Sequence, residues 1–71
     1  MKKLFDEICV FGLGFVGLTT ALSFTNKKYK VFGIDQDKSL IKSLNNGKIP
    51  FNEPYLQNYL KKSLKNNLFT I

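Results

Sequence analysis

The stretch Gly12-Leu13-Gly14-Phe15-Val16-Gly17 decides how this 71-residue sequence folds. It follows the apolar run 8–11 and opens a further apolar segment, a context that predicts a strand, a tight turn and a helix. In such a unit Gly12 permits the turn, Gly14 lets a diphosphate approach the backbone, and Gly17 lets the helix pack on the strand. The free N–H groups at the helix start favour an anion, so the stretch is typical of a dinucleotide-binding turn.

The apolar periodicity along the rest of the chain predicts the order β-α-β-α-α-β. The strands are expected at about 4–11, 29–34 and 68–71, and the helices at about 15–25, 38–44 and 55–65. This order indicates an α/β fold, half of a Rossmann-type parallel sheet that is truncated after the start of the third strand. We therefore expect residues 1–71 to form one partial dinucleotide-binding domain whose first strand has an open, apolar edge.

Several local expectations follow from residue type. The first strand is apolar enough to be covered on both faces. Asn26 is expected to take the left-handed conformation that ends the first helix. Asp37 is expected to cap the second helix, and Pro54 fits the first turn of the third. The first helix should bury one broad apolar face, made of Val16, Leu18, Ala21, Leu22 and Phe24.

Asp35 ends the second predicted strand and follows Gly17 by 18 residues. An acid at that spacing can accept hydrogen bonds from the adenosine ribose hydroxyls, and its charge repels a 2′-phosphate, which favours NAD over NADP. Two plainer interpretations stay open. Asp35 can simply begin a turn, and the glycines can form a strand–helix turn without a ligand.

The composition excludes several function classes. The formal charge of +6 comes from eleven lysines and five acids, but the lysines are scattered and arginine is absent, which does not favour nucleic acid as a partner. No apolar run approaches the ~20 residues that span a bilayer, so we expect no membrane partner and a cytoplasmic location. The single Cys9 lies in an apolar run without a histidine to activate it, and is expected to be a buried small hydrophobe. No cluster of ligands for a metal is present.

Three stretches together resemble a known family. They are Gly12–Leu18, Val31-Phe32-Gly33-Ile34-Asp35, and the segment Leu44–Pro54 with its Gly47, Pro50, Glu53 and Pro54. The combination resembles the N-terminal NAD-binding part of the UDP-glucose/GDP-mannose (nucleotide-sugar) 6-dehydrogenases. The resemblance implies two NAD used in succession to oxidise the sugar C6 alcohol to a carboxylate, through a thioester on a cysteine. It also implies that Gly12, Gly14 and Gly17 face the pyrophosphate, that the backbone N–H groups of Phe15 and Val16 bind it, and that Asp35 binds the ribose.

This sequence departs from the family pattern at several positions. Phe15 replaces a frequent tyrosine, Lys28 stands where a glycine usually ends the first helix, and Leu40 stands where a basic residue is common. The family's catalytic cysteine and its helpers lie far downstream of the region matched, so no catalytic residue is assigned and the chain alone is not expected to be active. Two alternatives remain, a fragment of a hydroxyacid-type NAD dehydrogenase and a non-enzymatic module that completes another chain's sheet. The expected partners are a dinucleotide and either the missing remainder of the enzyme or another protomer.

Overall fold

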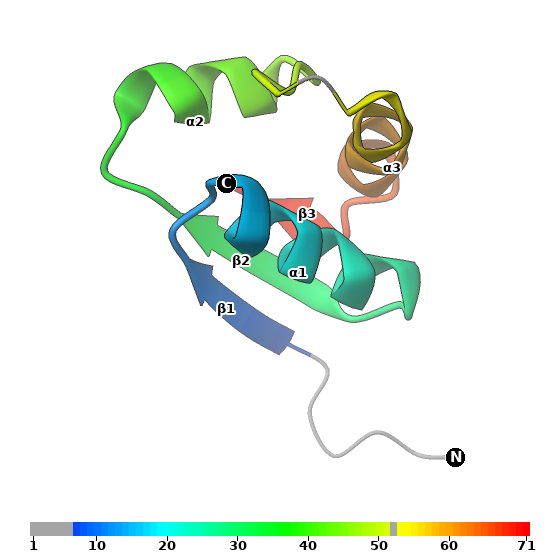
Figure 1. Ribbon diagram of the computed structural model, residues 1–71. Helices are drawn as coiled ribbons and strands as arrows, with labels where there is room; N and C mark the ends of the chain where they lie inside the picture. Colours follow the sequence, from blue (N-terminus) through cyan, green and yellow to red (C-terminus); the bar gives the residue numbers. More distant parts are fainter. Residues whose placement is uncertain (1–6, 52) are drawn as a thin grey trace.

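The computed structural model describes residues 7–51 and 53–71 (Figure 1). The predicted order of elements is confirmed, and within the described residues no boundary shifts by more than one residue. The part of the first predicted strand at 4–6 lies outside the described residues. The elements are β1 (Glu7–Phe11), α1 (Phe15–Asn26), β2 (Lys30–Ile34), α2 (Lys38–Asn45), α3 (Pro54–Lys65) and β3 (Phe69–Thr70).

The three strands form one parallel sheet in the order β1-β2-β3, so β1 lies at an edge as expected. Glu7 pairs with Lys30 and Phe11 with Ile34, while Val31 pairs with Phe69 on the other side of β2. The chain stays bonded to the sheet just beyond β1, because the Gly12 N–H donates to the Ile34 carbonyl at 2.7 Å. The carboxyl ends of β1 and β2 therefore lie side by side where the glycine turn begins.

All three helices end in the same way. After α1 the Lys28 N–H donates to the Thr25 carbonyl and the Tyr29 N–H to the Phe24 carbonyl, which is the Schellman pattern of helix termination. The rings of Phe24 and Tyr29 meet edge to face at 5.6 Å across that end. The pattern needs one residue with positive φ just after the helix. These residues are Lys28 (71°), Gly47 (74°) and Asn67 (59°) after α1, α2 and α3.

The expectation that Asn26 takes the left-handed conformation was wrong. Helix α1 continues through Asn26, and the positive φ falls two residues later on Lys28. The expectations for the helix starts are confirmed. The Asp37 carboxylate accepts from the Leu40 N–H at 3.1 Å, and Pro54 occupies the first position of α3.

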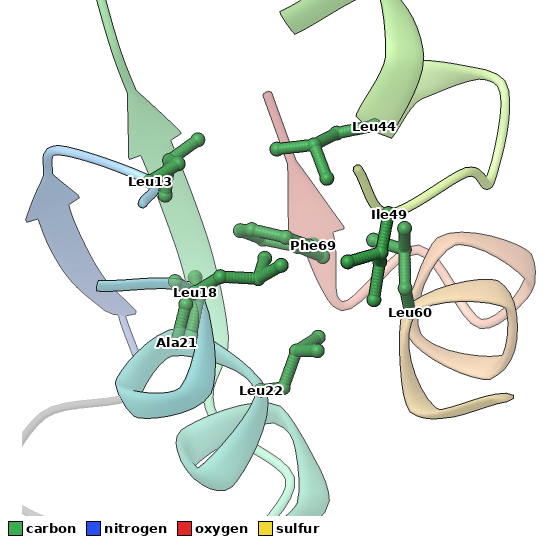
Figure 2. Packing of buried hydrophobic residues seen from close by; sticks show 9 residues of the cluster. Leu13, Leu18, Ala21, Leu22, Leu44, Ile49, Leu60 and Phe69 are labelled. Atoms are coloured by element: carbon green, nitrogen blue, oxygen red, sulfur yellow. The ribbon is translucent and has the colours of Figure 1, made fainter. Parts of the chain in front are cut away.

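The core lies between the sheet and the helices (Figure 2). Right-handed crossovers that progress in one direction place successive helices on one face of a parallel sheet, which explains this single core. A buried hydrogen bond between the hydroxyls of Thr25 and Ser63, at 2.7 Å, links α1 to α3. The buried apolar residues are Leu13, Leu18, Ala21, Leu22, Val31, Leu44, Ile49, Leu60 and Phe69.

The opposite face of the sheet corrects two expectations. Strand β1 is not covered on both faces, since Cys9 is exposed and Phe11 is 76% exposed. Cys9 is therefore not the buried hydrophobe that its apolar neighbours suggested. The physical reason is that no helix among the described residues packs on this face. Val16 is also outside the core, 74% exposed at the start of α1, while Leu18, Ala21 and Leu22 are buried as expected.

Candidate functional site

The glycine turn joins the carboxyl end of β1 to the amino end of α1. Gly12 has a φ of +90°, a conformation that a side chain disfavours, so its predicted role in the turn is confirmed. A Cβ on Gly17 would overlap the Gly12 carbonyl oxygen and lie 2.8 Å from the Gly12 carbonyl carbon. Gly17 is therefore required for the close packing of α1 on the turn itself.

Gly14 is required neither by its conformation nor by its protein neighbours. Its φ is −66°, and a Cβ added there would have no atom within 4 Å. The space beside Gly14 is open at the point where α1 begins. The N–H groups of Phe15, Val16 and Gly17 belong to the first turn of the helix and have no partner within it. The arrangement offers several N–H groups and the positive end of a helix dipole to an anion.

Asp35 lies beside this turn. One of its carboxylate oxygens accepts from the Leu13 N–H at 2.7 Å and the other accepts from the Asp37 N–H at 2.8 Å. These two bonds, that from Leu13 first, hold the pKa of Asp35 below its ordinary value, while partial desolvation opposes them. Asp35 is thus a carboxylate at neutral pH, with lone pairs left to accept further hydrogen bonds.

A groove of about 590 Å³ lies at the same edge of the sheet, lined by Phe11, Gly12, Ile34, Asp35 and Gln36. Its lining combines the apolar side chains of Phe11 and Ile34 with Asp35. A second groove of about 290 Å³ lies on the other side of the turn, with Gly14, Leu40 and Phe51 among its lining residues. An apolar surface, an ionised carboxylate and helix N–H groups without a partner in the helix are thus combined at one edge of the sheet.

Two contacts of this site escaped the sequence interpretation. The ring of Phe15, at the start of α1, meets the ring of Phe51 edge to face at 6.0 Å. The segment after α2, whose Pro50 and Pro54 helped to suggest the family, therefore touches the start of α1. Leu13 is fully buried and donates its N–H to Asp35. The burial of Leu13 could have been predicted from its type, because a leucine between two glycines is unusual in a loop that faces solvent, where a polar residue is favoured.

The structure brings together the glycine turn and Asp35, all the residues predicted for the cofactor. Cys9 lies apart from them, on the uncovered face of β1. Within residues 7–51 and 53–71, no three His, Cys, Asp or Glu side chains group as a metal site would require. Nor does any described helix combine the length and apolar character needed to cross a membrane.

Comparison with known proteins gives consistent matches. The model of the UDP-glucose/GDP-mannose dehydrogenase family, NAD binding domain, matches residues 6–71. A UDP-N-acetyl-D-mannosamine dehydrogenase of Campylobacter jejuni is 44% identical over 52 residues, which are 73% of this chain and 13% of that protein. The enzyme of that name from Methanococcus aeolicus is 41% identical over 59 residues, 83% of this chain and 14% of that protein.

Solved structures agree with this result. A UDP-glucose dehydrogenase from Pyrobaculum islandicum superposes with a TM-score of 0.87 at 29% identity, covering 93% of this chain and 15% of that one. A GDP-mannose dehydrogenase from Pseudomonas aeruginosa, solved as a ternary complex, gives a TM-score of 0.84 at 32% identity, covering 89% and 14%. The chain thus spans about one seventh of the length of these relatives.

Proposed function

Because the chain belongs to the UDP-glucose/GDP-mannose dehydrogenase family and matches its NAD-binding domain, we propose that the glycine turn and Asp35 hold the adenosine diphosphate half of NAD. In this proposal Gly12, Gly14 and Gly17 shape the surface that faces the pyrophosphate. The N–H groups of Phe15 and Val16 donate to it. Asp35 accepts from the hydroxyls of the adenosine ribose.

The observation that carries the proposal is the hydrogen bond between the Leu13 N–H and Asp35, at 2.7 Å. It fixes the acid directly against the turn, so one bound molecule can touch both. The open space beside Gly14 supports the same arrangement, because a diphosphate needs close approach to the backbone there. Phe11 and Ile34, which line the 590 Å³ groove together with Asp35, offer the adenine an apolar surface.

The charge of Asp35 sets the choice of dinucleotide. The bonds from Leu13 and Asp37 keep it ionised, and a 2′-phosphate placed beside it would meet a negative charge. We therefore propose NAD rather than NADP. The Asp35→Ala variant should lose roughly 10–100-fold in NAD affinity, since two hydrogen bonds to a charged group are removed. It should lose much less in NADP affinity.

Titration calorimetry with NAD and NADP, on the wild-type chain and Asp35→Ala, tests this proposal. Asp37→Ala is the matched control, because it removes a nearby acid whose carboxylate caps α2 and does not touch Leu13. A folded wild-type chain that binds no NAD at millimolar concentration would refute the proposal. So would equal losses of NAD affinity in the Asp35 and Asp37 variants.

The reaction of the whole enzyme is a further part of the proposal. We propose oxidation of the C6 alcohol of a UDP- or GDP-sugar to the carboxylate, a four-electron change for which two NAD would accept one hydride each in succession and water would supply the second oxygen. The support comes from the relatives, which are named for UDP-N-acetyl-D-mannosamine, UDP-glucose and GDP-mannose. The residues described here bind and orient the cofactor, and none of them acts on the sugar. The family model covers the proline-containing segment after α2 as well, which disfavours the hydroxyacid-type alternative.

The unpaired edge of β1 indicates a site where another protein segment can pair with the sheet. Since the Gly12 N–H bonds to β2, strand alternation turns the N–H and C=O groups of Glu7, Cys9 and Phe11 away from the sheet. In the strand order of doubly wound folds, this edge receives the second half of the sheet. We propose that the rest of such an enzyme, in the same chain or another protomer, pairs with β1 there and covers its exposed face.

The partner proposal is tested by size-exclusion chromatography of the 71-residue chain, alone and mixed with the remaining part of a relative. The Cys9→Pro variant removes an outward N–H without removing a bond to β2, and should abolish association. A dispersed monomer in both samples would contradict the proposal.

A further inference from the structure

The glycine turn is held by its own buried side chain as well as by its backbone. Leu13, between Gly12 and Gly14, is completely buried, although the residues on each side of it are exposed. Its side chain enters the core beside β2, where Phe69 of β3 also lies (Figure 2). Leu13 is therefore the buried side chain of a turn that is otherwise made of glycines and exposed residues.

The space that Leu13 occupies exists because β2 has a glycine at position 33. A Cβ on Gly33 would lie 2.9 and 3.0 Å from the two Cδ atoms of Leu13, and 3.0 Å from Cε1 of Phe69. Real side chains do not pack that closely, so a larger residue at 33 must shift the side-chain ends of both Leu13 and Phe69. The conformation of Gly33 is not the reason for glycine, since only Gly12 and Gly47 among the glycines have positive φ.

Leu13 is held by two residues of the same segment, Gly33 and Asp35, which strand alternation places two positions apart. Val31 and Gly33 lie on the buried face of β2, and Asp35 continues the same spacing of two just beyond the end of the strand. Gly33 receives the Leu13 side chain, and Asp35 receives the Leu13 N–H at 2.7 Å. The same residue of the turn is therefore fixed at two points by one strand.

We propose that Gly33 is a positioning residue for the cofactor turn. Because Gly33 has no side chain, the Leu13 side chain can pack against β2 at this point. That packing fixes the position of the Gly14–Val16 backbone, where the diphosphate binds. Asp35 then has two roles, as the ligand of the ribose and as the second anchor of the turn. This inference rests on the proposed function, because it assumes that the turn binds the diphosphate. On this inference Gly33 contributes to NAD affinity although it does not touch the ligand.

The test compares two ligands that occupy different parts of the site, adenosine and ADP. Adenosine reaches Asp35 and the apolar groove only, while ADP also needs the turn. Gly33→Ala should weaken ADP binding by at least about tenfold and adenosine binding by less than about threefold, because a displaced Leu13 moves the turn and leaves Asp35 in place. Amide exchange of Leu13, measured without ligand, should become faster in the same variant.

Two double variants separate positioning from general damage to the core. Leu13→Val removes both atoms that clash with residue 33, so Leu13→Val/Gly33→Ala should recover ADP affinity to within about threefold of Leu13→Val alone. Phe69→Leu relieves the contact with Phe69 and leaves the contact with Leu13. The Phe69→Leu/Gly33→Ala variant should therefore recover part of the stability but not the ADP affinity. If Gly33→Ala alone does not fold, the ADP affinities of the two double variants are compared with each other. Higher affinity in Leu13→Val/Gly33→Ala than in Phe69→Leu/Gly33→Ala supports the positioning role.

The proposal would be overturned by a folded Gly33→Ala variant that binds ADP like the wild type, by equal losses for ADP and adenosine, or by equal recovery in the two double variants. A wild-type chain that binds neither ligand would refute the proposed function instead. In that case the exchange of the Leu13 amide still tests the anchor. An unchanged exchange rate in Gly33→Ala would overturn it.

Discussion

Gly14 and Gly17 are two glycines of one motif, and the structure predicts opposite consequences for the same substitution. In Gly14→Ala the added methyl group meets no protein atom within 4 Å, and the φ of −66° is accessible to alanine. It would stand in the space where a diphosphate must approach the backbone. The fold should survive, and NAD binding should not.

The expected stability of Gly14→Ala can be worked from two opposing terms. Gly14 is the N-cap of α1, and alanine is a poorer cap than glycine by about 0.5–1 kcal/mol. Replacing glycine by alanine also restricts the unfolded chain, which stabilises the fold by about 0.4–1 kcal/mol. The terms nearly cancel, so the melting temperature should stay within about 4 °C of the wild type. NAD affinity should fall by about tenfold or more, which corresponds to about 1.4 kcal/mol.

Gly17→Ala is the matched comparison. Its methyl group would overlap backbone atoms of Gly12, which have no freedom to rotate away, so α1 must separate from the turn. The cost should reach about 3 kcal/mol or more, a large part of the stability of a domain of this size. Thermal unfolding followed by circular dichroism and calorimetric titration with NAD measure both properties. A Gly14→Ala variant that binds NAD normally, or that melts as early as Gly17→Ala, would refute the reasoning.

Three further predictions concern stability. Lys28→Gly should stabilise the chain by about 0.5–1 kcal/mol in chemical denaturation because residue 28 has positive φ, whereas Lys27→Gly, at a φ of −93°, should not. Thr25→Val should lower the free energy of unfolding by about 1–3 kcal/mol, because it leaves the buried Ser63 hydroxyl without its Thr25 partner. In a double-mutant cycle, Thr25→Val/Ser63→Ala should lose less stability than the sum of the two single variants. The lowered pKa of Asp35 predicts a stabilisation that is present above the ordinary carboxyl value of about 3.9 and is lost as the pH falls through the lower folded value. Urea unfolding at a series of pH values should therefore show the difference between wild type and Asp35→Asn shrinking below about pH 4, and a constant difference would contradict it.

The order of elements and the place of the site were predictable from the sequence because both depend on local signals. Glycines at fixed spacing, a following helix and an acid at the end of the next strand need only a few neighbouring residues to be recognised. The caps at Asp37 and Pro54 are equally local, and both are confirmed.

The errors about burial and about contacts between distant segments have a common physical origin. Whether Cys9, Phe11 or Val16 is buried depends on which element covers it, and that element need not be nearby in the sequence. An apolar strand predicts a neighbour on each face, but the described helices supply only one. The contacts of Leu13 with Gly33 and of Phe15 with Phe51 were missed for the same reason, since each joins segments that are distant in the chain.

The position of the left-handed residue after α1 shows a subtler limit. Asparagine is the better residue for positive φ, so residue type favoured Asn26. The hydrogen bonds of the helix end place that conformation on Lys28 instead. The geometry of the helix end outweighs the preference of a single residue.

The central claim is that NAD binds at the glycine turn beside Asp35. Titration of the isotope-labelled 71-residue chain with NAD, followed by amide chemical shifts, tests it most directly. We predict that the largest shifts fall on residues 12–17 and 35–37. No shifts at millimolar NAD, or shifts centred on the separate groove between α1 and α3 at Thr19, Ser23 and Tyr59, would contradict it.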